Sequence, residues 1–307
     1  PVNKYEREGK NAAIFTTGNG YMGVRGSFEE FGSIRVQGIY VRGYIGTIIE
    51  IMEPFPDNEY MKNFYFNEEK LKDFEKQESV VNLSDFLLVR ISVDGEVFYP
   101  WKGKILSWER TLDPKTGVLE RKVVWDNGSG KQTRFLFRRF ASYENKHKYC
   151  MYVSVSPLNY SGKIKILSGI DTKVKTCGQK ILREVGKFGD EVMVQQVKTA
   201  DKYGFEAAIG VKNEFRLNGK NADGAIQYCV CYRIRTDGNT EVIRKKTRVA
   251  EATFCEVYLT IQTNFSAGGD PNGAYREQAA LRAERAYEAG YEFLYREHTA
   301  FFSEQYG

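Results

Sequence analysis

Hydrophobic and polar residues alternate along most of the chain, from about residue 12 to residue 264. Glycine, asparagine and aspartate interrupt this alternation at short intervals. A period of two is the pattern of β-strands that bury one face, and the interrupting residues are those that turns favour. The sequence therefore predicts antiparallel β-structure over this length, with almost no helix inside it.

One hairpin is predicted nearly residue by residue within 85–99. The apolar residues at the odd positions of 87–93 fall on one face of a strand, and residues 96–99 form the returning strand. Between them, Asp94 and Gly95 suit the two positive-φ positions of a tight hairpin turn. The sequence thus specifies both the strands and the turn that joins them.

A second pair of strands, 105–112 and 118–125, follows around a turn at 113–117, so we expect four strands in an antiparallel meander. Further strand-like runs are 132–140, 149–155, 163–170, 192–198, 205–211, 226–234 and 254–263. One open sheet of this size would twist and leave long unpaired edges, so we predict a large antiparallel β-sandwich of two packed sheets. Residues 53–80 are polar and predict an irregular excursion or short surface helix.

The pattern changes at Asp270-Pro271, where a capping residue precedes a proline and predicts the start of a helix. Apolar residues then recur mostly at spacings of three, four or seven and form one stripe: Ala280, Ala283, Tyr287, Tyr291, Leu294 and Phe301. Gly290 is expected to divide this segment into two helices. The aromatic residues near its end suggest that it packs against a neighbouring domain. We predict a β-sandwich domain over 1–268 and a helical linker over 269–307.

The composition is that of a folded chain. Of 307 residues, 42% are hydrophobic and 14% are aromatic, which excludes a disordered or collagen-like protein. The 45 Lys and Arg against 40 Asp and Glu give a net charge of +5, spread along the sequence. Phosphate-backbone binding needs a dense basic stripe, so nucleic acid is not expected as a partner.

The sequence also indicates a cellular location. It contains no apolar run of about 18 residues, and residues 1–8 do not resemble a secretion signal. We therefore expect a cytoplasmic protein with no membrane partner. The five cysteines are an odd number and are expected to be reduced and mostly buried: Cys150, Cys177, Cys229, Cys231 and Cys255.

Residues 18–23, Gly-Asn-Gly-Tyr-Met-Gly, match the spacing of a dinucleotide-binding fingerprint, and residues 13–16 before them could form the required strand. That fingerprint must open a helix, however, and residues 24–28 contain glycine and alternation instead. We interpret the glycines as positions that need positive φ or a close backbone approach, as in a corner between strands.

Residues for metal or acid–base chemistry are few. His147 and His298 are the only histidines, expected in a polar turn and on the terminal helix, and no Cys-x-x-Cys pair accompanies them. Cys229 and Cys231 would lie on one face of a strand, as small core residues do. No pair of carboxylates stands out for glycosidic chemistry. We predict no metal site in this chain, and the residues alone do not single out a catalytic pair.

Residues 19–26, Asn-Gly-Tyr-Met-Gly-Val-Arg-Gly, followed by Glu29-Glu30, resemble the Asn-Gly-Tyr-x-Gly-x-Arg-Gly opening of glycoside hydrolase family 65. This family contains maltose, trehalose and kojibiose phosphorylases. The other segments that resemble it in order and spacing are 81–83, 91–96, 112–113, 117–119 with Arg121, 139–142 and 168–171. The likeness covers nearly the whole chain.

The resemblance implies a large galactose-mutarotase-like β-sandwich, or supersandwich. Linker helices would join it to an (α/α)6 barrel that holds the catalytic glutamate and the phosphate site. Family members are much longer than 307 residues, so it also implies that this chain ends before the barrel. The parent enzyme would perform inverting phosphorolysis, or hydrolysis, of an α-glucose disaccharide such as maltose, trehalose or kojibiose. Inorganic phosphate would be its co-substrate, with no other cofactor.

Two functions remain open. In the first, the chain is a non-catalytic domain that supports the barrel of the same polypeptide and the formation of a homodimer. The second is a free-standing carbohydrate-binding or mutarotase-like sugar epimerase sandwich. A mutarotase-like catalyst resembles a His-plus-Glu arrangement on strands, which neither histidine here matches, so we prefer the first.

The glycine-rich corner supplies the candidate site residues. If it faces the barrel, Asn19, Tyr21, Arg25 and Glu29 are candidates for interdomain or near-active-site contacts. The alternative is a strained corner inside the sandwich, with Arg25 paired to a local carboxylate.

Overall fold

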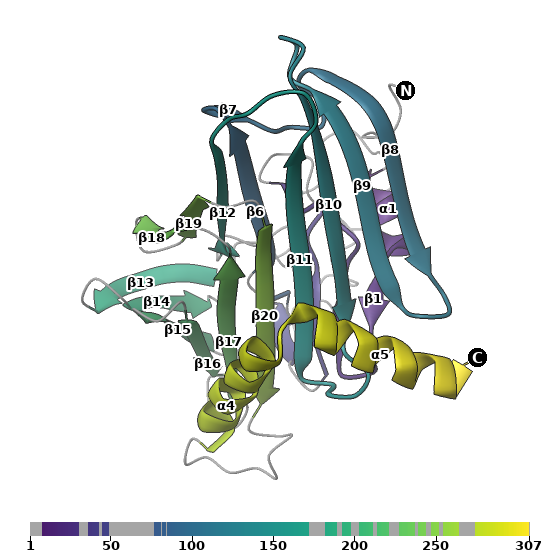
Figure 1. Ribbon diagram of the computed structural model, residues 1–307. Helices are drawn as coiled ribbons and strands as arrows, with labels where there is room; N and C mark the ends of the chain where they lie inside the picture. The colour runs from purple at the N-terminus through teal and green to yellow at the C-terminus, as the bar shows by residue number, and fades with distance from the viewer. Residues whose placement is uncertain are drawn as a thin grey trace, which may run out of the picture.

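The computed structural model describes most of the chain (Figure 1). The described residues are 8–30, 36–42, 45–48, 77–80, 82–83, 85–171, 182–188, 192–197, 203–210, 214–220, 227–236, 239–243, 247–251, 254–263 and 274–306. Side chains are described for 8–30, 36–42, 80, 82–83, 85–166, 256–261 and 277–305. The helix start predicted at 270–271 and most of the predicted excursion at 53–80 lie outside the described residues.

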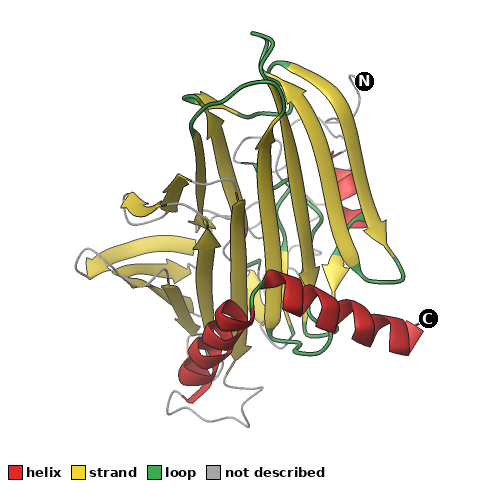
Figure 2. Cartoon of the chain, viewed as in Figure 1, coloured by secondary structure: helices red, strands yellow, loops and turns green. Residues whose placement is uncertain are grey.

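The larger of two main sheets has ten antiparallel strands in the order β13-β14-β15-β16-β17-β20-β11-β10-β9-β8 (Figure 1). Figure 2 shows the strands in yellow. In chain order these are β8 (Lys104–Asp113), β9 (Val118–Asp126), β10 (Gln132–Ala141), β11 (Lys148–Pro157), β13 (Leu182–Phe188), β14 (Val192–Val197), β15 (Tyr203–Gly210), β16 (Glu214–Lys220), β17 (Gln227–Thr236) and β20 (Phe254–Thr263). The strand runs predicted in this range are confirmed, and β13 and β16 are additional.

The smaller main sheet has five strands in the order β18-β19-β12-β6-β7. These are β6 (Asp85–Val93), β7 (Glu96–Val97), β12 (Ile164–Asp171), β18 (Asn239–Ile243) and β19 (Thr247–Glu251). The predicted hairpin joins β6 to β7, with Asp94 at φ 50° and Gly95 at φ 84°. The expected four-strand meander was wrong, because the chain passes from this sheet to the ten-stranded sheet between β7 and β8.

The two main sheets pack face to face, which confirms an antiparallel sandwich. The main buried cluster takes Phe86, Val89 and Ile91 from β6 and joins them to the inner face of the ten-stranded sheet. That face is formed by alternate residues of four strands: Val123 and Trp125, Phe135 and Phe137, Met151 and Val153, and Val257 and Leu259. Strand alternation therefore places these side chains inside, as the period of two requires.

Two helices cover part of the outer face of the ten-stranded sheet (Figure 1). They are α4 (Ala274–Ala289) and α5 (Tyr291–Tyr306), separated at Gly290 with φ 82°, as predicted. Tyr291 and Leu294 pack with Phe140, Cys150 and Tyr258, which point outward from β10, β11 and β20. This part of the apolar stripe thus packs on the chain's own sheet, whereas Phe301 and Phe302 near the end of α5 are half-buried, and the contact expected there with a neighbouring domain stays a prediction.

The N-terminal part forms smaller elements beside the sandwich. Helix α1 (Glu8–Ile14) precedes a three-stranded sheet of β1 (Thr17–Gly18), β2 (Met22–Val24) and β3 (Ile39–Val41), and β4 (Ile45–Ile48) pairs with β5 (Gln77–Val80). The suggestion of a strand at 13–16 was wrong, because α1 extends to Ile14 and turns its Ala12 into the core. Cys150 is free and buried, and the side chains of the other four cysteines lie outside the described set.

Candidate functional site

The glycine-rich corner is a strand, a turn and a strand. Gly20, with φ +82°, lies between β1 and β2, and a Cβ at Gly26 would lie 2.3 Å from the carbonyl oxygen of Phe15. The motif ends in β2, and residues 25–28 after it form no helix, so the helix that a dinucleotide fingerprint requires is not present here. Positive φ at Gly20 and close approach at Gly26 account for two of its glycines.

Asn19 is buried and holds the corner together through both ends of its amide. Its Oδ1 accepts hydrogen bonds from the backbone N–H groups of Tyr21 (3.1 Å) and Met22 (3.0 Å). Its Nδ2 donates to the backbone carbonyls of Ser142 (2.7 Å) and Lys146 (2.9 Å), in the loop between β10 and β11. One side chain thus fixes the corner against a loop more than a hundred residues away in sequence.

Tyr21 and His147 are brought together by this arrangement. Their ring centroids lie 4.2 Å apart, and both side chains are half-buried. The Nδ1 of His147 lies 3.0 Å from the carbonyl oxygen of Ile261, which can only accept, so Nδ1 carries the hydrogen. Burial, with a smaller contribution from the charge of Arg282 on α4, lowers the pKa of His147. The imidazole is therefore neutral at pH 7.

Arg25 lies at the edge of the corner and is half-buried. Its Nη2 donates a hydrogen bond to the carbonyl of Gly9 (2.9 Å). Its alkyl stem lies against Gly38, where an added Cβ would come within 2.3 Å of the Arg25 Cδ. The described contact of the guanidinium is thus a backbone carbonyl on α1, whereas the local alternative had paired it with a carboxylate.

Glu29 belongs to a cluster of charged side chains buried inside the sandwich. Nη2 of Arg121 donates to Glu29 and to Glu30, at 2.6 Å in each case, and Arg139 Nε lies 3.2 Å from Glu29. Arg121 is 2% exposed and Glu29 is 3% exposed. Nearby, Arg110 donates to Glu8 of α1 at 3.0 Å. We call these six residues, Glu8, Glu29, Glu30, Arg110, Arg121 and Arg139, the ionic cluster.

The charges within the ionic cluster have different consequences for its carboxyl groups. Burial raises the pKa of Glu29, but the positive charges of Arg139 and Arg121 outweigh it, so this pKa lies below its ordinary value. For Glu30, burial prevails over the charge of Arg121, and its pKa is raised. Arg121 also lies over the ring of Phe137, with its guanidinium carbon 4.0 Å from the centroid. The cluster ties α1 and residues 29–30 to β8, β9 and β10.

Sequence reasoning named Glu29 but missed the arginines that hold it, and it treated His147 as a solvated turn residue. A signal for the arginines was present. Arg121 follows Leu119 and precedes Val123 at core-facing positions of β9, and Arg139 holds the equivalent place on β10. A charged residue in register with an apolar face indicates a buried ion pair.

The buried ionic cluster and the partly exposed residues near the glycine-rich corner can do different chemistry. The ionic cluster is closed to solvent, so its carboxylates hold structure together and are not exposed to a substrate. Tyr21, Arg25 and His147 are partly exposed and can contact another molecule or domain. Within the described residues, no three His, Cys, Asp or Glu side chains come close enough to hold a metal ion. Among the described helices, none combines the length and apolar character needed to cross a membrane.

Several curated proteins related to this chain are phosphorylases. The 3-O-α-D-glucosyl-L-rhamnose phosphorylase of Lachnoclostridium phytofermentans is 50% identical over 214 residues, covering 69% of this chain and 28% of the relative. The kojibiose phosphorylase of Halothermothrix orenii is 28% identical over 292 residues, covering 94% of this chain and 34% of the relative. The chain therefore spans about a third or less of the length of these relatives.

A solved structure, of a protein assigned as a kojibiose phosphorylase from human microbiome, matches with a TM-score of 0.69. The match covers 97% of this chain and 36% of the other, at 17% identity, and so supports the fold. The profile of the glycosyl hydrolase family 65 N-terminal domain matches residues 2–304. Because this match covers almost the full length of the chain, the chain belongs to the N-terminal domains of glycosyl hydrolase family 65.

Proposed function

We propose that this chain is the non-catalytic N-terminal domain of a longer α-glucoside phosphorylase. The observation that carries the proposal is the 50% identity to a 3-O-α-D-glucosyl-L-rhamnose phosphorylase. The matched region makes up only 28% of the length of that relative. The chemistry named for that relative would then be performed by residues outside this chain. The sandwich would support the catalytic part.

In the proposed reaction, inorganic phosphate attacks the anomeric carbon of the glucosyl group from the face opposite the leaving sugar. A carboxylic acid gives its proton to the glycosidic oxygen as the bond to the anomeric carbon breaks. The products are glucose 1-phosphate with inverted configuration and the released sugar. Glu29 and Glu30 are unsuited to this role, because both are buried and bound to Arg121.

The corner residues are proposed to support the catalytic part in two ways. Tyr21 and Arg25 are partly exposed and would make interdomain or near-active-site contacts. Asn19 and Glu29 are buried and would act from beneath, Asn19 by fixing the corner and Glu29 through the ionic cluster. The substitution Arg25→Ala in the full-length enzyme tests the proposed contact of Arg25. We expect lower activity or a lower melting temperature. If neither changes, the proposed contact is contradicted.

The proposal is tested with two proteins, the 307-residue chain and the full-length polypeptide. Each is incubated with phosphate and, separately, with 3-O-α-D-glucosyl-L-rhamnose, kojibiose, trehalose and maltose, and glucose 1-phosphate is measured. We expect phosphate-dependent release by the full-length protein on at least one substrate and none by the chain alone. Absence of glucose 1-phosphate from both proteins on every substrate would sink the proposal.

The mutarotase-like alternative is tested with the chain alone by polarimetry on α-D-glucose and α-D-galactose. We expect no acceleration above the buffer rate. His298 is 1% exposed and stacks on Phe140 at 4.4 Å, so it is inaccessible to a sugar, and His147 uses Nδ1 on a backbone carbonyl. Clear turnover would replace the domain proposal with an epimerase.

We also propose that the parent enzyme is a cytoplasmic homodimer. The basis is the odd number of cysteines in this chain and the similarity of the chain to phosphorylases. Light scattering of the purified full-length protein should give twice the mass of one chain. A monomer at micromolar concentration would remove the dimer from the proposal.

A further inference from the structure

We propose that Tyr21, His147 and Arg282, here named the corner site, receive a carboxylate side chain from the catalytic part of the same polypeptide. This inference rests on the proposed function, because it needs a catalytic part beyond this chain. It adds the chemistry of the contact, which neither the family nor the relatives' names specify. The three residues come from the glycine-rich corner, the β10–β11 loop and α4, which lie at the same end of the sandwich (Figure 1).

The second ring nitrogen of His147, Nε2, defines what the corner site can bind. Nδ1 donates to the carbonyl of Ile261, and the backbone of His147 accepts from the N–H of Ile261 at 2.9 Å. The ring is therefore fixed with Nε2 as its remaining nitrogen. A neutral Nε2 accepts a hydrogen bond, and a protonated Nε2 donates one, which is the form that a carboxylate stabilises.

Arg282 supplies positive charge to the same place. Its charge lowers the pKa of His147, and the pKa of Arg282 itself is lowered by burial and influenced by Tyr21. The rings of Tyr21 and His147 are in contact, with centroids 4.2 Å apart, and the charge of Arg282 reaches both from α4. A carboxylate suits such a place, because a guanidinium and a protonated imidazole can each donate a hydrogen bond to one of its oxygens.

The surroundings of the corner site are mainly basic. Arg42, exposed on the segment after β3, donates its backbone N–H to the carbonyl of Tyr21, and Lys146 is exposed immediately before His147. Glu144 in the same loop lies 3.5 Å from Lys148 and is engaged there. An approaching acidic side chain would thus meet positive charge on several sides, which favours its association.

Asn19 makes the corner site rigid. It bonds the backbone of Tyr21 and the carbonyl of Lys146 at the same time, so the two rings keep their separation without a bound partner. A contact whose groups are already in place loses less conformational entropy on binding. This explains why a buried asparagine in the corner motif would matter for a contact that it does not itself make.

The test compares the pKa of His147 in the 307-residue chain with its pKa in the full-length polypeptide. Hydrogen–deuterium exchange at the imidazole Cε1 position, followed by peptide mass spectrometry, measures both. In the chain we expect a pKa below the ordinary value of 6.5. In the full-length protein a carboxylate within ion-pair distance should raise it by about one to three units. An unchanged or lower pKa would overturn the inference.

Two controls sharpen this measurement. His298 lies on the face of α5 that packs on Phe140 of β10, is buried there, and should keep its pKa of about 4 in both proteins. In the chain, Arg282→Gln should raise the pKa of His147, whereas Arg285→Gln, on an exposed residue of the same helix, should leave it unchanged. Equal effects of the two substitutions would show that Arg282 does not face His147, which also overturns the inference.

His147→Gln gives a readout that a purely structural role would not produce. If the pKa of His147 is raised in the full-length protein, His147 stabilises that fold below pH 6.5, and the stabilisation is lost as pH rises through the raised pKa. If the pKa is lowered in the chain alone, His147 makes the chain less stable as pH falls below 6.5. The substitution should therefore change the pH dependence of the melting temperature in opposite directions in the two proteins. The same direction in both contradicts the proposal. If the pKa rises but no glucose 1-phosphate forms, the contact stands and the proposed function fails.

Discussion

The two faces of the ten-stranded sheet are built from the same strands but bury opposite chemistry. On the inner face, Arg121 and Arg139 reach into the interior and hold Glu29 and Glu30. On the outer face, Phe140, next to Arg139 in sequence, lies under the aromatic side chains of α5. At this end of β9 and β10 charged groups face inward and an aromatic group faces outward, whereas further along the same strands the inner face is apolar, with Val123, Phe135 and Phe137. What covers each face decides which residues it needs.

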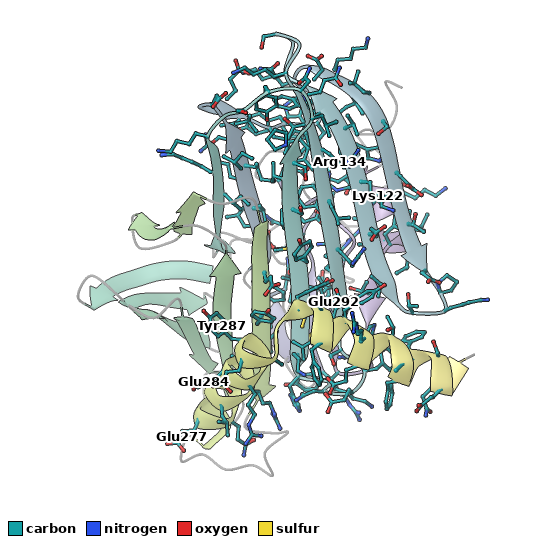
Figure 3. All side chains as sticks on the ribbon, viewed as in Figure 1. Lys122, Arg134, Glu277, Glu284, Tyr287 and Glu292 are labelled. Carbon is teal, nitrogen blue, oxygen red and sulfur yellow. The ribbon has the colours of Figure 1, made fainter. Side chains whose placement is uncertain are left out.

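The difference follows from the covering elements. The inner face near β8 to β10 is covered by α1 and residues 29–30, which bring carboxylates, so guanidinium groups are the complementary partners. The outer face is covered by α5, which brings Tyr291, Leu294 and His298 (Figure 3 labels Glu292 on its exposed side). The first contact depends on matched charges and the second on packed area.

The largest expected effect comes from removing Arg121. Arg121→Met keeps the approximate length but leaves Glu30 without its guanidinium in a buried position. Breaking a buried ion pair from one side typically costs about 3 to 5 kcal/mol of unfolding free energy. Urea denaturation of the chain measures this loss. Arg134→Met, on an exposed arginine of β10 (Figure 3), is the matched control and should change stability by less than about 0.5 kcal/mol. Equal effects would show that the ionic cluster does not hold the inner face.

The next effect tests the outer face. Leu294→Ala on α5 removes a side chain that is 3% exposed and should cost about 2 to 5 kcal/mol, because a cavity remains beneath the helix. Phe293→Ala, one residue away and 59% exposed, should change the unfolding free energy of the chain by less than about 0.5 kcal/mol. Thermal or urea unfolding distinguishes the two. A larger loss for Phe293 would mean that α5 is rotated relative to the sheet.

The third effect distinguishes the faces by pH. Burial lowers the pKa of His298 to about 4. His298 therefore becomes protonated near pH 6.5 in the unfolded chain but only near pH 4 in the folded chain. The free energy of unfolding falls as pH is lowered from 6.5 to about 4. The fall amounts to about 3 kcal/mol, which is the equivalent of a pKa difference of about 2.5. His298→Phe keeps the stacking on Phe140 and should remove this part of the pH dependence. An unaltered profile would show that His298 is not buried in its neutral form.

The smallest effect is a difference within the ionic cluster. Glu29 has a lowered pKa and Glu30 a raised one, so the fold favours the charge on Glu29 and disfavours it on Glu30. At pH 7, Glu29→Gln should therefore cost about 1 to 3 kcal/mol, and Glu30→Gln should cost clearly less. Parallel urea titrations measure the difference. The opposite order would mean that Arg121 and Arg139 pair chiefly with Glu30.

Local features of the fold were predictable because neighbouring residues specify them. The turn at Asp94-Gly95, the division at Gly290 and the strand runs from 105 to 170 all depend on side chains within a few positions. The assignment of strands to sheets was not predictable in this way. The chain changes sheets after β7, and β20 pairs with β11 although about a hundred residues separate them. Such pairings depend on the packing of the whole core.

The candidate site also has features that the local sequence predicts and features that only the folded structure shows. Asn19, Tyr21, Arg25 and Glu29 were identified by the resemblance of their motif, but the sequence does not show which of them are exposed. Tertiary structure buries Asn19 and Glu29 and leaves Tyr21 and Arg25 half-exposed. Asn19 bonds the loop between β10 and β11, and Ile261 bonds His147 in that loop, so that the rings of His147 and Tyr21 meet.

The sequence by itself determined the class of structure and the order of its elements, because alternation, turn residues and helix breaks act over a few positions. Tertiary structure decided which charges are buried, which helix face packs on the sheet and which distant residues share the corner site. The physical reason is that burial and ion pairing depend on what covers a surface. For this chain the covering segments come from opposite ends of the sequence.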